Sequence, residues 1–134
     1  MSDAALAGQV ALVSGSSSGI GAATARRLAA AGAAVVVNSS RSTAAGEQLA
    51  AELPRAIYVQ GNVAAEADCR RLVEAAVAHF GRLDILVNNA GTTQVIPHAD
   101  LDAVTDEVFR RILDVNLLGT WYLSRAALPH LRQS

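Results

Sequence analysis

Four short apolar runs, each followed by a longer stretch of helical periodicity, constrain the fold of this chain more than any other feature. The apolar runs cover residues 9–14, 34–38, 56–60 and 83–88. The run at 34–38 is dominated by valine, which is typical of a strand buried on both faces. The stretches with apolar residues three and four apart cover about 20–31, 43–53, 66–80 and 105–131. This alternation predicts an α/β fold, a parallel sheet with helices on both faces.

The length of the chain allows one domain with a real core. Its 134 residues are too few for two such domains. Hydrophobic residues make up 51% and charged residues 17%, which excludes general disorder because the chain can bury enough apolar surface to fold. We therefore expect residues 1–134 to form a single domain.

Composition also excludes several classes of partner. The formal net charge of −1 leaves no basic field for nucleic acid or an anionic membrane, and no apolar run approaches the ~20 residues of a membrane span. Cys69 is the only cysteine, so neither an intrachain disulfide nor a cysteine zinc site is expected. The three histidines lack metal-ligand spacing, and we expect no metal. Residues 1–9 lack the pattern of a signal peptide, which makes a cytoplasmic setting the default expectation.

The strongest local motif is a glycine-rich loop, Ser14–Gly15–Ser16–Ser17–Ser18–Gly19–Ile20–Gly21, between the first strand and the first helix. Such a junction leaves backbone N–H groups free at the positive end of a helix, where a phosphate binds well. Glycines let the backbone turn tightly and approach a pyrophosphate. By itself the motif is also compatible with a turn that has no function.

A second motif, Asn88–Asn89–Ala90–Gly91, follows the fourth strand. Ligands of open α/β sheets bind beyond the carboxyl ends of the strands, which is where this motif falls. Taken alone, it fits a plain strand-to-loop turn better than a site.

Together, these motifs and the segment Asp114–Val115–Asn116–Leu117–Leu118–Gly119 resemble the classical short-chain dehydrogenase/reductase family. The resemblance covers nearly the whole chain. It implies a Rossmann-type, doubly wound sheet in a three-layer αβα arrangement. It also implies that the chain is the N-terminal, cofactor-binding half of such an enzyme, incomplete at its C-terminus after the fourth strand and the following helix.

The resemblance also implies site residues. The glycine loop would wrap the pyrophosphate of a nicotinamide dinucleotide, with Ser14 in place of the usual threonine. Asn62, where the family usually has aspartate, would contact adenine, and Asn116 would be the catalytic asparagine. The implied cofactor-binding set is Gly15, Ser17, Ser18, Gly19, Ile20, Gly21, Ser39, Ser40, Arg41, Asn62, Val63, Asn89, Ala90 and Gly91.

The segment after the second strand favours NADP(H) over NAD(H). NAD-selective enzymes place an acid there to bind the ribose 2′-OH, whereas this chain has Asn38–Ser39–Ser40–Arg41–Ser42. A guanidinium and hydroxyls suit a 2′-phosphate, so Arg41 is the candidate clamp. The alternative is a solvated loop arginine. Ser18 departs from the pattern, because many NADP-preferring relatives carry a basic residue there.

The family's acid/base pair, a tyrosine with a lysine four residues later, is missing. Tyr58 and Tyr122 are followed at that distance by Asn62 and Ala126, and the chain contains no lysine. The resemblance implies an oxidoreductase that acts on a carbonyl or alcohol substrate. Because the acid/base pair is missing, we expect the 134-residue chain alone to be inactive. The alternatives are a non-catalytic dinucleotide-binding module, or a fragment that binds no cofactor and pairs with a partner chain.

The last helical stretch also predicts association. Its apolar residues, from Val108 to Leu123, are too many for one narrow stripe, so some should face the sheet and others a second chain. The family resemblance implies homo-oligomers, tetramers or dimers, in which this helix packs against a neighbour. Association with a C-terminal half is the other possibility.

Overall fold

The computed structural model describes residues 4–134, so the expectation about a signal peptide falls partly outside the described residues. One parallel sheet has the strand order β3-β2-β1-β4. The strands are β1 (Val10–Val13), β2 (Ala34–Ser39), β3 (Ala56–Gln60) and β4 (Ile85–Val87). The chain reverses direction across the sheet after β3, which leaves β1 and β4 adjacent.

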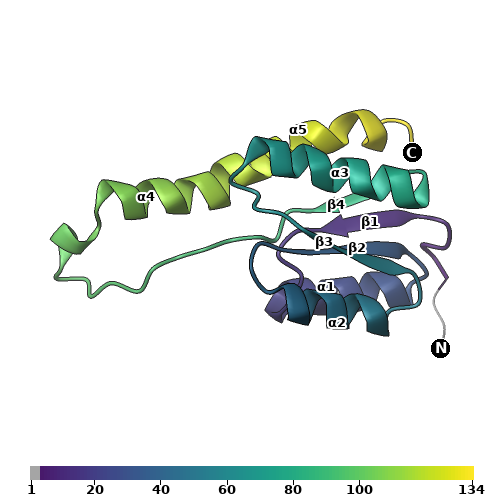
Figure 1. Ribbon diagram of the computed structural model, residues 1–134, viewed down its shortest axis with the longest axis horizontal. Helices are drawn as coiled ribbons and strands as arrows, with labels where there is room; N and C mark the ends of the chain where they lie inside the picture. The colour runs from purple at the N-terminus through teal and green to yellow at the C-terminus, as the bar shows by residue number, and fades with distance from the viewer. Residues whose placement is uncertain (1–3) are drawn as a thin grey trace.

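Helices cover both faces of the sheet (Figure 1). On one face lie α1 (Gly19–Ala30) and α2 (Thr43–Glu52), and on the other lie α3 (Glu66–Phe80) and α5 (Gly119–Leu131). Each face has its own apolar core. Leu12, Leu72 and Leu123 centre the α3–α5 side. Val35 and Val37 centre the alanine-rich α1–α2 side. The predicted Rossmann-type, three-layer fold is confirmed.

Two strands are shorter than the apolar runs predicted. The run at 9–14 yields a strand over Val10–Val13, and the run at 83–88 yields one over Ile85–Val87. At β4 the reason is visible, because the Asp84 carboxylate accepts a hydrogen bond from the backbone N–H of Val10 at 2.8 Å. The N–H of Val10, at the start of β1, is therefore bonded to a side chain and not to the backbone of a neighbouring strand.

The expected single helix over 105–131 is wrong in detail. The structure has α4 (Asp106–Leu113), a π-helical turn η2 (Asp114–Leu118) and α5 in succession, preceded by a short 3₁₀ turn η1 (Leu101–Ala103). Widened turns of this kind are rare and occur often at functional sites. Asn116 lies in the middle of η2.

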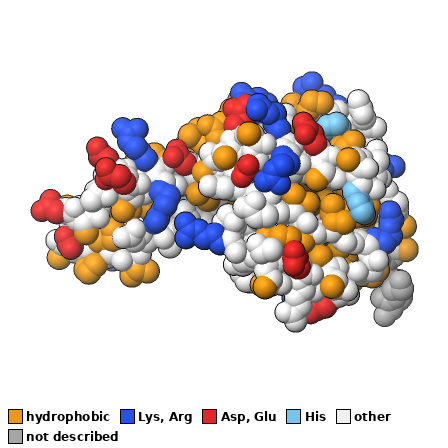
Figure 2. All heavy atoms as spheres, in the orientation of Figure 1, with side chains coloured by type: hydrophobic (Ala, Val, Ile, Leu, Met, Phe, Trp, Pro, Cys, Tyr) orange, Lys and Arg blue, Asp and Glu red, His pale blue; other side chains and the backbone are white. Residues whose placement is uncertain are grey.

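The segment 91–113, here called the arm, projects from the body (Figure 1). None of the residues of α4 is buried. Of the apolar residues between Val108 and Leu123 that were expected to divide between the sheet and a second chain, Leu123 is fully buried and Val115 packs partly against the same core, while Leu118 and Trp121 are exposed. Hydrophobic side chains gather on the arm in Figure 2, and exposed ones in this segment include Val95, Leu101, Val104, Phe109 and Leu113.

Candidate functional site

A cleft of about 960 Å³ opens beyond the carboxyl ends of the strands. It is bounded by the glycine loop, the segments after β2, β3 and β4, and one side of α4. Every predicted cofactor-binding residue lines this cleft except Gly19 and Gly21, which support it from the first turn of α1. Predicted residues up to 76 positions apart in sequence are therefore brought together.

The glycine loop is held close to its surroundings. Gly15 has φ +60°, and a Cβ there would meet the backbone of Ala90. A Cβ on Gly21 would collide with the carbonyl of Gly15 and the side chain of Asn89, so α1 starts against the loop only because this residue is glycine.

The start of α1 fits an anion. Ser18 at its N-cap makes no side-chain cap hydrogen bond, and the N–H groups of Gly19, Ile20 and Gly21 have no hydrogen-bond partner among residues 4–134. Free donors at the positive end of a twelve-residue helix are what a pyrophosphate needs.

Ser14 joins the two motifs. Its buried Oγ accepts hydrogen bonds from the N–H groups of Asn89 and Ala90, both at 3.0 Å. The Asn89 side chain returns a bond from Nδ2 to the carbonyl of Gly15 at 2.9 Å. The loop after β4 is thus fixed against the glycine loop, which places Ala90 and Gly91 on the cleft wall.

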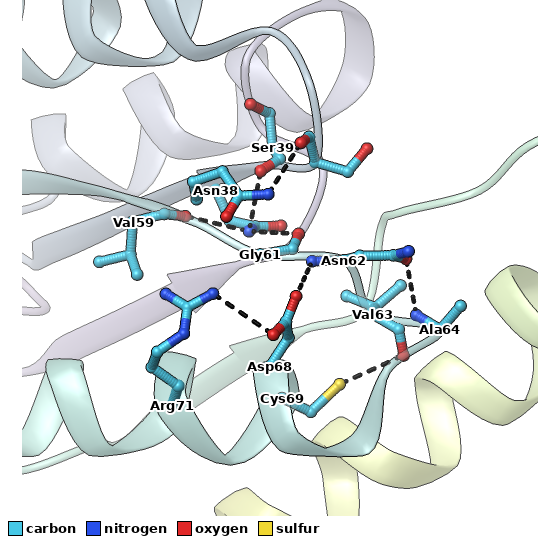
Figure 3. A network of polar contacts seen from close by, with 12 residues as sticks. Asn38, Ser39, Val59, Gly61, Asn62, Val63, Ala64, Asp68, Cys69 and Arg71 are labelled. Atoms are coloured by element: carbon cyan, nitrogen blue, oxygen red, sulfur yellow. Dashed lines mark hydrogen bonds and ion pairs between the residues drawn. The ribbon is translucent and has the colours of Figure 1, made fainter.

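Asn38 also lines the cleft and was not among the predicted residues. Asn38 is 1% exposed near the end of β2, and its side chain bonds Gly15 of the glycine loop. The same side chain bonds Val59 of β3 and Gly61 in the turn after β3 (Figure 3). A buried amide costs free energy unless its hydrogen bonds are made, so an asparagine that ends a valine run was the available signal.

The turn after β3 is also hydrogen-bonded internally. Asn62 donates its N–H to the Asp68 carboxylate at 2.8 Å and accepts from the N–H of Ala64 through Oδ1 at 3.0 Å (Figure 3). Cys69 lies behind this turn, with its thiol directed to the carbonyl of Val63 at 3.3 Å. Burial, with smaller effects from Asp68 and Glu66, raises the pKa of Cys69 to about 11, so the thiol is an inert core group.

The corner after β2, residues 39–42, is supported by hydroxyl and amide side chains from the ends of β2 and β3. Ser39 Oγ and the Tyr58 hydroxyl are 2.6 Å apart, and Gln60 donates from Nε2 to the carbonyl of Ser40 at 2.9 Å. Arg41 is exposed on the cleft, and its guanidinium has no ion-pair partner within the described part of the chain. The predicted residues Ser39, Ser40 and Arg41 line the cleft here, and the support from Tyr58 and Gln60 was not predicted.

Asn116 does not line the cleft. Its amide exchanges two hydrogen bonds with the backbone of Thr92, Oδ1 accepting at 2.8 Å and Nδ2 donating at 2.9 Å. The π-helical turn is thereby tied to the loop after β4. Arg110 and Arg111 of α4 do line the cleft and were not predicted, because no motif marks them.

Residues 4–134 lack two other kinds of feature. No group of three or more metal-ligating side chains lies close together in this range. Across the same residues, no helix combines the length and the apolar character needed to cross a membrane.

The parallel sheet, its helical layers and the cleft at its carboxyl edge define a Rossmann-type α/β protein. The family model described as short chain dehydrogenase matches residues 9–134. The chain belongs to the short-chain dehydrogenase family.

Individual relatives agree. "Granaticin polyketide synthase putative ketoacyl reductase 2" of Streptomyces violaceoruber is 62% identical over 93% of this chain and 50% of its own length. An L-fucose dehydrogenase of Oryctolagus cuniculus is 42% identical over 99% of this chain and 46% of its own. A short chain dehydrogenase of Burkholderia cenocepacia J2315, solved in complex with NADP, has a TM-score of 0.89 and 39% identity over 95% of this chain and 52% of its own. The chain spans about half the length of the curated relatives it matches.

Proposed function

We propose that this chain is the dinucleotide-binding part of an NADP(H)-dependent oxidoreductase that interconverts a carbonyl and an alcohol. The observation that carries the proposal is the cleft, which gathers the glycine loop, the loop after β4 and an acid-free corner after β2. A bound nicotinamide dinucleotide would supply hydride transfer. Membership of the family and the NADP complex of the Burkholderia cenocepacia relative support this assignment.

The chain's own residues would bind and orient the cofactor. The first turn of α1 offers three free N–H donors to a pyrophosphate, and Ser14 keeps Ala90 and Gly91 against it. Arg41, without an ion-pair partner within residues 4–134 and preceded by Ser39 and Ser40, would bind a 2′-phosphate.

The substrate is proposed only as a class. The relatives' names refer to a ketoacyl group and to L-fucose, which have little in common beyond a carbonyl or alcohol carbon. We propose Asn116 as a catalytic residue because of the family resemblance; its side chain bonds the backbone of Thr92, which lines the cleft. A non-catalytic dinucleotide-binding module is the second candidate, favoured by the lack of a lysine four residues after either tyrosine. Hydride transfer by the protein that carries this chain would exclude it.

Cofactor choice is tested by Arg41→Ala, with binding of NADP⁺ and NAD⁺ measured by calorimetry. A hydrogen bond to a charged group contributes about 1.5–3 kcal/mol, so NADP⁺ should bind roughly 10- to 150-fold more weakly while NAD⁺ changes little. Arg132→Ala, which removes an exposed arginine outside the cleft, is the matched control. Equal losses for both cofactors would show that Arg41 does not contact the phosphate. Failure of the unmodified protein to bind either cofactor would refute the binding function itself.

A further inference from the structure

Asn38 is a buried polar side chain whose bonds connect two walls of the cleft. It lies at the end of β2 with 1% of its surface exposed. Through Oδ1 it accepts a hydrogen bond from the N–H of Gly15 at 3.0 Å, in the glycine loop. Through Nδ2 it donates to the carbonyls of Val59 at 3.1 Å and Gly61 at 3.2 Å, at the end of β3 (Figure 3).

The backbone of Asn38 adds to this connection. Its N–H donates to Ser16 Oγ at 3.0 Å, and its carbonyl accepts from the N–H of Ser16 at 2.7 Å. Ser16 in turn donates its hydroxyl to the carbonyl of Val13. One residue therefore holds the glycine loop, β2 and the turn that leads from Gly61 into Asn62.

We propose that Asn38 is a positioning residue, which sets the spacing between the phosphate-binding loop and the turn after β3 and thereby the affinity for a ligand that spans both. The inference rests on the proposed function, because a dinucleotide is such a ligand. Asn38 acts through the backbone of Gly15 and Gly61, both of which line the cleft.

The chemistry of the position requires an amide. One planar group must offer an acceptor on one side and N–H donors on the other. An ionised carboxylate of the same shape still offers an acceptor to Gly15. In place of the N–H donors, however, it turns a second negative oxygen toward the carbonyls of Val59 and Gly61, which repel it. No bonding partner of Asn38 is charged. On the surrounding elements, Arg41 faces the cleft, Asp68 bonds Asn62 and Arg71, and the Tyr58 hydroxyl bonds Ser39.

Asn38→Asp tests this reasoning through pH. Burial and the facing carbonyls raise the pKa of the introduced carboxyl, so its protonated form can donate to β3 as the amide does. The donor is then lost as the pH rises through that pKa. Affinity for NADP⁺ is measured by calorimetry at about pH 5 and about pH 8 and divided by the unmodified protein's value at the same pH. Gln48→Glu, the same change of group on the exposed side of α2, is the control.

At the higher pH, Asn38→Asp should bind NADP⁺ on the order of tenfold more weakly than the unmodified protein, with most of the loss recovered at the lower pH. The control should show no such difference between the two pH values. A loss of equal size at both pH values, or no loss at either, would overturn the proposal.

A second readout needs no cofactor and separates this inference from the proposed function. Amide hydrogen exchange of the segment 13–18 should be faster in Asn38→Asp than in the unmodified protein at the higher pH, because the carboxylate is repelled by the carbonyls of Val59 and Gly61 and its acceptor oxygen is no longer held in place against Gly15. If the unmodified protein binds neither dinucleotide, the proposed function fails while this exchange difference still decides whether Asn38 positions the loop. Unchanged exchange would refute the positioning role.

Discussion

Replacing Ser14 by alanine should destabilise the protein by about 2–4 kcal/mol. The Ser14 hydroxyl oxygen accepts two backbone hydrogen bonds, from Asn89 and Ala90, at 3.0 Å each. An N–H left without an acceptor costs about 1–3 kcal/mol. Because Asn89 and Ala90 are only partly buried, water can reach them, and each loss falls in the lower part of that range.

Urea denaturation followed by circular dichroism measures this effect. With an m-value of about 2 kcal/mol/M, in the middle of the usual range for urea, the midpoint should fall by roughly 1–2 M in Ser14→Ala. Ser14→Thr keeps the hydroxyl and adds only a methyl group, so it should lose much less. A midpoint unchanged in Ser14→Ala, or equally lowered in both variants, would refute the idea that this oxygen holds the loop after β4.

Three further outcomes are expected. Hydrogen bonds from Arg82 first, and then the N–H of Val10, lower the pKa of Asp84 against the opposing effect of burial. The ionised carboxylate therefore stabilises the fold above the ordinary carboxyl pKa, and this stability is lost as the pH falls through the lowered pKa. In urea titrations, Asp84→Asn should accordingly destabilise the protein strongly at pH ~7 and much less at pH ~3. Gly46→Ala should destabilise the protein, because the added Cβ meets the Tyr58 ring and overpacking costs about 1–3 kcal/mol. This cost opposes the gain of about 1 kcal/mol that alanine brings to a helix, and a higher urea midpoint would contradict the prediction. The chain should associate at low micromolar concentration in sedimentation experiments, since hydrophobic side chains of the arm and α5 are exposed, and a single compact 13.8 kDa species would contradict it.

The elements of this fold were predictable because their signals are local. The valine run at 34–38 and the spacing of Cys69, Leu72, Val73 and Ala76 each encode one strand or one helix face, and all of them are buried as expected. The arm was not predictable in this way. An amphipathic period forecasts a helix over 106–113, yet it carries no information on what that helix packs against.

The cleft was found through its motifs, while its supports were missed. Asn38, Tyr58 and Gln60 act through side chains that bond residues 19 to 21 positions away in the chain, and their own positions show no spacing rule. The π-helical turn at Asn116 was missed for a related reason. Helical periodicity over 105–131 is nearly the same with or without one widened turn, and the bonds to Thr92 that accompany the turn come from a distant loop.

The two sides of the cleft differ in how they are held, and this difference bears on ligand binding. The buried side chains of Ser14 and Asn38 join the glycine loop and the turns after β3 and β4 to the sheet. Because these loops are already held in place, they lose little conformational entropy when a ligand binds. The α4 wall contributes Arg110 and Arg111, yet the described chain attaches it to the loop after β4 through exposed contacts, such as that between Arg111 and Gln94. Solvent screens such contacts, and they contribute little stability. Affinity for the phosphate and adenine portions of a dinucleotide should therefore depend on the sheet-anchored loops, whereas the position of α4 depends on what packs against its exposed apolar side.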